Sequence, residues 1–151
     1  MRVVVQRVSK AKVTVGGSTV GEIGRGLCLL VGISLGDGSA DVEMMVDKVV
    51  GLRIFADGAG KMNRSILDVD GEMLIVSQFT LLGDVTRGRR PSFTGAAPPV
   101  QAAPLMDVMM KRCRDRGLSV AAGEFGAHME VSLVNDGPVT LVLETQDGRF
   151  V

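Results

Sequence analysis

The chain has 151 residues and a formal net charge of zero, because 17 lysines and arginines balance 17 aspartates and glutamates. Hydrophobic residues make up 46% of the sequence and charged residues 23%, which excludes a disordered chain and leaves enough apolar side chains for a core. The balanced charge argues against a protein held to nucleic acid by its overall charge alone, whereas a local basic patch stays compatible with phosphate binding.

Cysteine usage and hydropathy indicate a reducing compartment. Cys28 and Cys113 are isolated and form no CxxC pair, so no disulfide framework is expected. No apolar run approaches the ~20 residues that span a bilayer, and the N-terminal segment is too short and too charged for a secretory leader. We therefore expect a cytoplasmic protein with no membrane partner.

The first third of the chain predicts β-strands. Valine-rich or alternating segments cover 2–8 and 12–15, and a glycine turn leads into a third strand over 18–23. Residues 27–33 form a continuous apolar run, which is typical of a central strand buried on both faces.

A first amphipathic helix is predicted after the glycine-rich break at 36–39. Ser39 is the expected N-cap residue, since its hydroxyl can accept a hydrogen bond from the first turn. Apolar residues recur at helical spacing, and these are Val42, Met45, Val46, Val49 and Val50. Packing on a sheet must supply most of the stability of this helix, because β-branched residues are mediocre helix formers.

Connections and one strand fill the middle of the chain. Residues 57–60 and 65–70 predict connections, and 73–76 predicts a strand. Residues 83–99 show little periodicity and are rich in glycine, proline and arginine, so we interpret them as a long ordered loop. Loops of that length are usually either functional or disordered.

A second helix is predicted over 99–116. Its apolar stripe consists of Met106, Met109, Met110 and Cys113. Pro104 removes an interior hydrogen bond and predicts a kink or a later start, and Gly117 is expected to end the helix. The last third returns to strands at 119–121, 127–134 and 139–144.

The order of these elements predicts the fold class. We expect an α+β fold of mostly antiparallel, barrel-like sheets with two main helices packed on them. No repeat or linker interrupts the chain, so residues 1–151 are expected to form a single domain.

The sequence argues against several kinds of site. His128 is the only histidine and has no cysteine or carboxylate at ligand spacing, so neither a metal nor a cofactor is expected. The GxSxG elbow of serine hydrolases is missing, and a Ser-His-Asp arrangement would have to use His128. The glycines that flank Arg25 lack the third glycine and the helix of a dinucleotide site.

A polar motif interrupts the strand pattern at Ser77, Gln78, Phe79 and Thr80. On an extended strand Gln78 and Thr80 point to the same side, so an amide and a hydroxyl would share one face. These groups are either polar residues on a solvent face, or they orient a polar ligand and, with backbone N–H groups, stabilise an oxyanion.

A second interruption is the segment Asn135-Asp136-Gly137-Pro138, which reads as a turn. Pro138 also denies the next strand one ladder hydrogen bond. The segment is therefore an ordinary hairpin turn, or a rigid element that presents backbone carbonyls to a ligand.

A third feature is the basic loop that contains Arg87, Arg89, Arg90 and Phe93. The loop is either simply solvated, or it contacts phosphate or a 3′-terminal nucleotide through arginine charge and phenylalanine stacking.

Together these segments resemble the D-aminoacyl-tRNA deacylase family, also called D-tyrosyl-tRNA deacylases. Ser-Gln-Phe-Thr-Leu at 77–81 is similar to the first motif of the family, and Asn-Asp-Gly-Pro-Val-Thr at 135–140 to its second. The N-terminal Met-Arg-Val-Val-Val-Gln-Arg-Val and the Arg-Arg-Pro-Ser-Phe segment match as well. The likeness spans essentially the whole chain.

The resemblance implies a homodimer whose active sites lie at the subunit interface. Gly137 and Pro138, joined by a cis bond, would enter the pocket of the other subunit and reject L-amino acids, and Arg7 would help to hold that loop. The pocket would be lined by Ser77, Gln78, Phe79 and Thr80. The reaction would be hydrolysis of the ester of D-aminoacyl-tRNA, together with glycyl-tRNA mischarged on tRNA-Ala. The tRNA 3′ end is the expected partner, and DNA is not.

The chemistry of these residues fits such a reaction, because an activated ester needs positioning and oxyanion stabilisation more than a strong base. Two mechanisms stay open, one with the Thr80 hydroxyl as nucleophile and one in which the tRNA 2′-OH assists. Thr80 has no evident general base beside it, which favours the second. The competing functions are a non-catalytic RNA-binding module and a small-molecule esterase.

Overall fold

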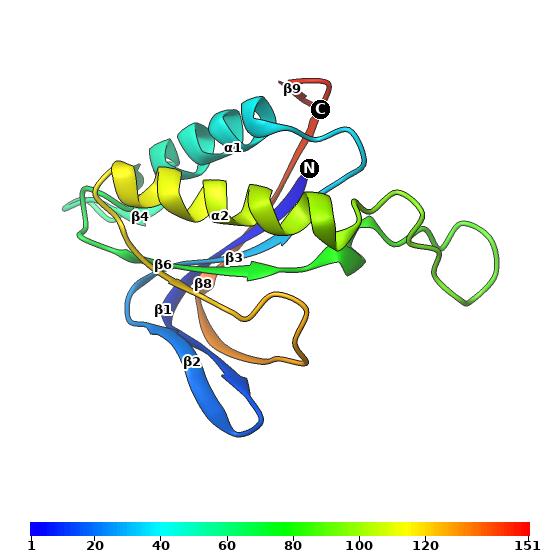
Figure 1. Cartoon of the computed structure of the whole chain (residues 1–151). Helices are drawn as coiled ribbons and strands as arrows, with labels where there is room; N and C mark the ends of the chain where they lie inside the picture. The colour runs from blue at the N-terminus through cyan, green and yellow to red at the C-terminus, as the bar shows by residue number, and fades with distance from the viewer.

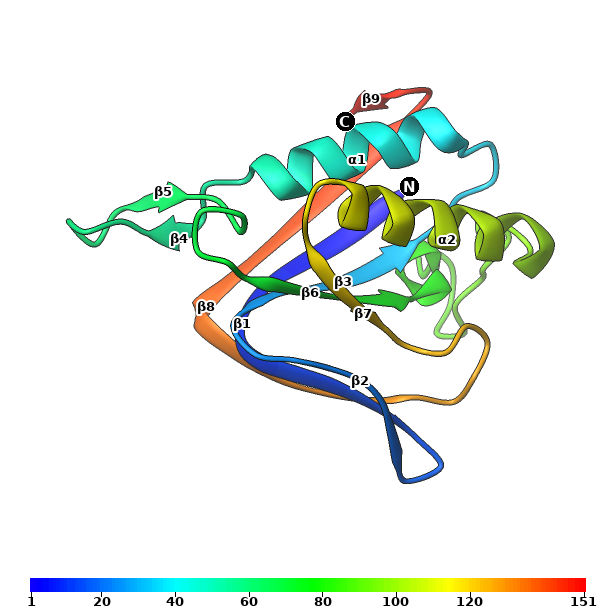
Figure 2. The same ribbon diagram turned by 60° about the vertical axis from the view of Figure 1, so that its left-hand side comes forward.

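The computed structural model describes residues 1–151, and its centre is a seven-stranded sheet with two helices on one face (Figure 1). The helices are α1 (Ser39–Gly51) and α2 (Pro99–Asp115). The strands of the main sheet are β1 (Arg2–Val15), β2 (Ser18–Ile23), β3 (Gly26–Gly32), β6 (Glu72–Ser77), β7 (Ser119–Ala122), β8 (Glu130–Gln146) and β9 (Arg149–Phe150). A separate hairpin of β4 (Phe55–Ala56) and β5 (Met62–Arg64) projects from the body (Figure 2).

The strand order β7-β6-β3-β1-β8-β9, with β2 also paired to β1, combines antiparallel and parallel pairings. β1 is antiparallel to β2, β3 and β8, whereas β3–β6 and β6–β7 are parallel. Each parallel pair is joined by a crossover that contains a helix. Since both crossovers step in the same direction and such connections are right-handed, α1 and α2 lie on the same face. The predicted α+β class, mostly antiparallel with two packed helices, is confirmed.

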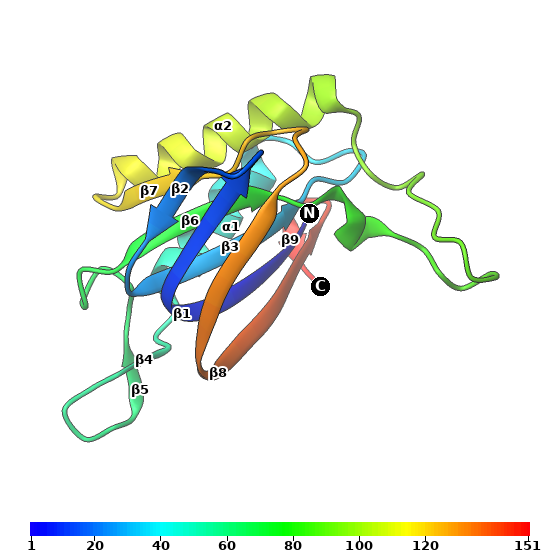
Figure 3. The same cartoon turned by 90° about the horizontal axis from the view of Figure 1, so that it is seen from below.

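The main core lies between the sheet and the two helices. It is a cluster of 23 buried residues, in which Val3 and Val5 of β1 and Leu29 of β3 meet α1 residues such as Met45 and Val49. A second cluster of seven buried residues joins Val8, Ala11, Val13, Ile23, Cys28, Leu74 and Val76. No helix covers this other side of the sheet, where β1, β2 and β8 curl round (Figure 3).

Three details of the first half differ from the sequence-based predictions. β1 is one strand of 14 residues instead of two segments, because β2 and β8 pair with its middle and far end. The N-cap of α1 is Gly38 instead of Ser39, and the Asp41 side chain accepts a hydrogen bond from the Gly38 N–H at 3.0 Å. The β4–β5 hairpin was not predicted, because β5 is exposed and has no apolar pattern.

The second helix begins at Pro99 as predicted, so of the two effects expected from Pro104, a kink or a later start, the later start does not occur. Proline is well tolerated at the first helical position, and Ala102, Met106 and Met109 hold the following turns against the core. The last helical residue is Asp115, and Gly117 stops the helix as predicted from the C′ position, with φ +90°. The Leu118 N–H donates to Cys113 and the Gly117 N–H to Arg114, the pattern of a Schellman cap.

Candidate active site

The first polar motif lies where β6 ends and the chain turns. Gln78 continues the parallel ladder, because its N–H donates to the carbonyl of Val31 at 2.7 Å. β6 itself stops at Ser77, and Phe79–Leu82 forms one turn of 3-10 helix, η1. The expectation of an extended strand through Thr80 is therefore wrong. Sequence pattern alone does not distinguish a strand end from such a turn when the next residues are also apolar.

The turn nevertheless keeps the amide and the hydroxyl together. The Gln78 side-chain N–H donates a hydrogen bond to the Thr80 hydroxyl oxygen. The Thr80 oxygen thus acts as an acceptor, and no carboxylate or imidazole accepts a hydrogen bond from it. A hydroxyl in that position is an orienting group more readily than an activated nucleophile.

A cavity of about 640 Å³ opens beside this turn. One wall is formed by the four residues of the motif, Ser77, Gln78, Phe79 and Thr80. The other walls come from the end of β3, the start of α2, and two loops. These contribute Ile33, Phe93, Ala96, Ala97, Pro99, Ala102, Phe125, Gly126, Ala127, His128 and Met129. The cavity is thus mostly apolar with a few polar groups, which is typical of a small-molecule site.

The loop 125–129 between β7 and β8 is the part of this site that sequence reasoning missed. Its position depends on the path of the chain between two strands, which no local pattern encodes. The only signal in the sequence was Phe125, because the chain has just five phenylalanines. The structure leaves this side chain 40% exposed. His128 lines the cavity but makes no side-chain hydrogen bond. No three His, Cys, Asp or Glu side chains are grouped so as to hold a metal.

Phe93 lies in the cavity wall. Its ring packs edge-on against Phe79, with 5.1 Å between centroids and 73° between planes. Gly83 permits this approach, because a Cβ on that residue would lie 2.9 Å from the Phe93 ring. The aromatic residue of the basic loop therefore belongs to the same pocket as the first motif.

The three arginines of the basic loop are exposed and lie outside the cavity. Paired backbone hydrogen bonds between Asp84 and Ser92, of 2.7 and 2.9 Å, close the base of the loop that carries Arg87, Arg89 and Arg90. This loop extends far from the sheet (Figure 1). Its base adjoins the cavity through Phe93, so the charge lies at the outer approach to the site.

The second motif does not form a hairpin turn, so that interpretation is wrong. β8 runs through it from Glu130 to Gln146, and the Gly137-Pro138 bond is cis. Gln6 of β1 pairs with Thr140 and Val8 pairs with Asn135, so residues 136–139 bulge out opposite a single residue of β1. We call these four residues the β8 bulge. A sequence typical of a turn can lie inside this strand, because β8 pairs with β1 both before and after the bulge.

Asn135 and Arg7 hold the β8 bulge. The Asn135 side chain accepts a hydrogen bond from the Val139 N–H at 3.1 Å and donates to the Thr140 hydroxyl at 2.7 Å. The Arg7 guanidinium donates to the carbonyls of Asp136 and Ile54 at 3.0 and 2.6 Å. Only 14% of the Arg7 side chain is exposed, and this restricts its movement.

Within one chain the two motifs do not meet. Neither Gly137 nor Pro138 lines the cavity beside Thr80. Residues 136–138 are exposed to solvent instead. One chain therefore contains a pocket and, elsewhere, an exposed rigid bulge.

Neither cysteine is suited to nucleophilic chemistry. Burial raises the pKa of the Cys28 thiol to about 11, and burial also raises the pKa of Cys113 to about 11. Both thiols stay protonated near neutral pH and lie outside the cavity lining. None of the helices has the length and apolar character needed to cross a membrane.

Known proteins are similar to this chain over almost its whole length. Residues 4–144 match the family model described as D-Tyr-tRNA(Tyr) deacylase. The D-aminoacyl-tRNA deacylase of Roseiflexus sp. (strain RS-1) is 57% identical over 145 residues, covering 96% of this chain and 94% of the relative. That of Heliobacterium modesticaldum is 55% identical over 149 residues, covering 99% of both chains.

Two solved structures share the fold. A c-Myc DNA unwinding element binding protein superimposes with a TM-score of 0.90 at 45% identity, covering 97% of this chain and 99% of the other. A probable eukaryotic D-amino acid tRNA deacylase superimposes with a TM-score of 0.79 at 21% identity, covering 93% of this chain and 97% of the other. The second likeness concerns the fold alone.

Proposed function

The chain belongs to the D-aminoacyl-tRNA deacylase family, hydrolases that cleave the ester bond between a D-amino acid and tRNA, and we propose that it does so in the cavity beside η1. The observation that carries this placement is the pairing of the Gln78 amide with the Thr80 hydroxyl in the wall of a mostly apolar cavity. The proposed catalytic residues are Ser77, Gln78, Phe79 and Thr80. Such an enzyme removes the wrong amino acid from tRNA and so serves translation quality control.

The proposed mechanism relies on backbone groups more than on an activated side chain. The first N–H groups of a helical turn have no carbonyl acceptor within the turn, and in η1 these belong to Phe79 and Thr80. Such donors can stabilise the oxyanion that forms when water attacks the ester. In this proposal the tRNA 2′-OH assists, and Thr80 orients the substrate. The absence of a base at Thr80 supports this role.

The chiral filter is proposed to act between subunits. The β8 bulge is rigidly held and exposed, and it lies outside its own cavity, which suits insertion into the pocket of a second chain. The open face of the sheet supports a homodimer, because it carries Val142, which is 64% exposed, beside the half-buried Val4. Carbonyls of Gly137 and Pro138 would engage the substrate α-amino group and leave no room for an L side chain.

A filter built from backbone reads the substituents of the α-carbon and ignores the identity of the D side chain. Glycine has no side chain to reject, so glycyl-tRNA mischarged on tRNA-Ala is a proposed second substrate. We further propose that Arg87, Arg89 and Arg90 contact the tRNA backbone and that Phe93 contacts the terminal nucleotide. Residues 1–151 would act as one deacylase domain in the cytoplasm, where aminoacyl-tRNA is found.

The decisive experiment measures the release of labelled amino acid from D-aminoacyl-tRNA and from its L counterpart. We expect rapid release of the D-amino acid and retention of the L-amino acid. Equal rates would refute the chiral filter, salt-dependent tRNA binding without turnover would indicate an RNA-binding module, and cleavage of simple esters without tRNA would indicate an esterase.

The role of Thr80 is tested by Thr80→Ala. We expect this variant to keep substantial activity, with kcat lowered by about tenfold or less, because it removes an orienting group and leaves the backbone donors in place. Complete loss of activity in a correctly folded variant would identify Thr80 as the nucleophile.

A further inference from the structure

The first two residues of the chain are hydrogen-bonded to Asp37 and Leu81, which do not line the proposed catalytic cavity but are connected to two of its walls. We propose that Arg2 and Asp37 are positioning residues that fix these two walls relative to each other through the N-terminal end of β1. We call the four residues Met1, Arg2, Asp37 and Glu144 the N-terminal clamp. The inference rests on the proposed assignment of the active site to the cavity beside η1.

One arm of the clamp holds the turn that carries Thr80. The Arg2 guanidinium donates a hydrogen bond of 2.7 Å to the carbonyl of Leu81, the residue that follows Thr80. Two further donor nitrogens of Arg2 bind both carboxylate oxygens of Glu144, at 2.9 to 3.1 Å. Arg2 and Glu144 lie directly opposite each other on β1 and β8. A bidentate pair of this kind fixes the plane of the guanidinium, and hence the donor that reaches Leu81.

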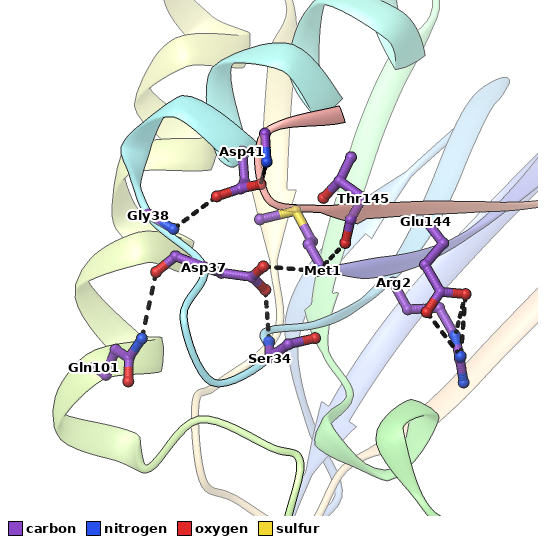
Figure 4. Close-up of polar contacts among 10 residues, drawn as sticks. Met1, Arg2, Ser34, Asp37, Gly38, Asp41, Gln101, Glu144 and Thr145 are labelled. Carbon is purple, nitrogen blue, oxygen red and sulfur yellow. Dashed lines mark hydrogen bonds and ion pairs between the residues drawn. The ribbon is translucent and has the colours of Figure 1, made fainter. Parts of the chain in front are cut away.

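The other arm begins at the amino group of Met1 (Figure 4). This group lies 2.8 Å from one Asp37 carboxylate oxygen and donates a 2.9 Å hydrogen bond to the carbonyl of Thr145. The side chains of Met1 and Asp37 are 0% and 6% exposed, so the ion pair is shielded from solvent. The second Asp37 oxygen accepts a 2.6 Å hydrogen bond from the Ser34 N–H.

Asp37 is thereby connected to a second wall of the cavity, the one that contains Ile33 and residues 96–97. Next to Ser34, the Leu35 N–H donates to the carbonyl of Gly95 at 3.0 Å. The Ala97 N–H donates to the carbonyl of Ile33 at 2.9 Å, and both of these residues line the cavity. The wall at 96–97 is therefore hydrogen-bonded to a loop whose shape Asp37 sets.

The two arms meet at Met1 and Arg2, the residue before β1 and the first residue of that strand, and this gives them a shared effect. A substrate between η1 and the 96–97 wall is correctly placed only if both walls keep their separation. Small errors in such placement are costly, because a misplacement of about 1 Å can lower a rate by about 100-fold. No part of the clamp touches the reacting atoms, so the expected effect is on kcat more than on the affinity for tRNA.

The test compares Arg2→Met with Arg2→Lys and with Lys10→Met, an exposed residue on the same strand. For Arg2→Met we expect kcat on D-aminoacyl-tRNA to fall about tenfold, with KM within about twofold of the parent. Arg2→Lys should recover part of the loss, because an ammonium can still donate to Leu81 but cannot bind Glu144 in the same planar way. Lys10→Met should match the parent.

The second arm is tested by Asp37→Asn, with the exposed Asp70→Asn as its control. We expect Asp37→Asn to lower kcat about tenfold and Asp70→Asn to leave it unchanged. A chain with two added residues before Met1, which moves the charged amine away from Asp37, should behave like Asp37→Asn. Hydrogen exchange should show faster exchange at 79–83 in Arg2→Met and at 95–97 in Asp37→Asn, with other segments unchanged.

The inference is overturned if both kcat and the exchange at 79–83 and 95–97 are unchanged in the clamp variants while the parent is active. It is also overturned if exchange accelerates uniformly over the molecule, which would indicate general destabilisation. These outcomes are distinct from a failure of the proposed site. If the clamp variants alter exchange at 79–83 and 95–97 without any loss of activity, the cavity beside η1 is not where catalysis occurs.

Discussion

Replacement of Gly137 by alanine tests the β8 bulge at its most constrained point. A Cβ at this position would lie 2.9 Å from the Arg7 Nη2 and 2.9 Å from the Val139 Cγ2. The residue also has φ +128°, a backbone conformation that residues with a side chain rarely adopt. The variant must therefore either keep a strained backbone and displace Arg7, or let the bulge move.

We expect Gly137→Ala to lower the free energy of unfolding by about 1–3 kcal/mol, the usual cost of a residue held in a sparsely populated region. The displacement of Arg7 places the value in the upper half of that range. If the bulge is the chiral filter of a second subunit, the rate on D-aminoacyl-tRNA should fall at least about tenfold. The ratio of D to L rates should fall as well.

The assays are urea unfolding and paired deacylation of D- and L-aminoacyl-tRNA. Two glycines supply matched controls. Gly17→Ala introduces a side chain at a positive φ, +81°, with nothing within 4 Å, and so isolates the backbone effect. Gly58→Ala has open space and no such φ, and should change stability by about 0.5 kcal/mol or less. A Gly137→Ala protein as stable as Gly58→Ala, with unaltered D and L rates, would refute the reasoning.

Three other perturbations give separate tests. His128→Asn should keep activity within about threefold, since general-base catalysis is typically worth about 100-fold or more, and a loss of that size would show that the imidazole acts as the base. Replacing Arg87, Arg89 and Arg90 together by glutamine should weaken tRNA binding. The slope of the logarithm of the binding constant against the logarithm of the salt concentration should fall in magnitude by about 0.7 for each phosphate that the loop no longer neutralises. An unchanged slope would show that the tRNA binds elsewhere. Burial raises the pKa of both cysteines from 9.0 to about 11, so their thiols lose protons at lower pH in the unfolded chain than in the folded one. The free energy of unfolding should therefore fall as pH rises from 9 towards 11. Urea unfolding at pH values of about 8 and about 10.5 measures this decline, which should shrink when both cysteines are replaced by alanine; equal pH dependence in the two proteins would contradict it.

Sequence periodicity predicted those elements whose buried stripe is continuous. α1 was found because Val42, Met45 and Val49 all pack on the sheet, and β3 because both of its faces are covered. The β4–β5 hairpin buries Phe55 of β4, whereas β5 is exposed, so the hairpin has no repeated buried stripe and was missed for that reason. Local pattern thus reports repeated burial, and elements without it leave no comparable signal.

The candidate site was predicted by residue type better than by shape. The resemblance identified the residues of both motifs, but not the 3-10 turn after Ser77 or the continuity of β8 past Pro138. Both depend on pairing with distant strands, through Val31 in the first case and Gln6 in the second. The place of loop 125–129 in the cavity wall likewise depends on strand pairing, because β7 and β8 on either side of the loop fix its course.

The central place of β1 in the sheet has a consequence for how the chain is made. β1 is synthesised well before β8, yet one of its two long edges pairs with that strand. Until residues 130–146 emerge, a valine-rich edge has no partner and the β1–β8 pairing cannot form. A contact between segments so far apart in the sequence favours slow folding, which cannot be completed before β8 has been made. The nascent chain must therefore keep this edge from pairing with other chains until β8 emerges.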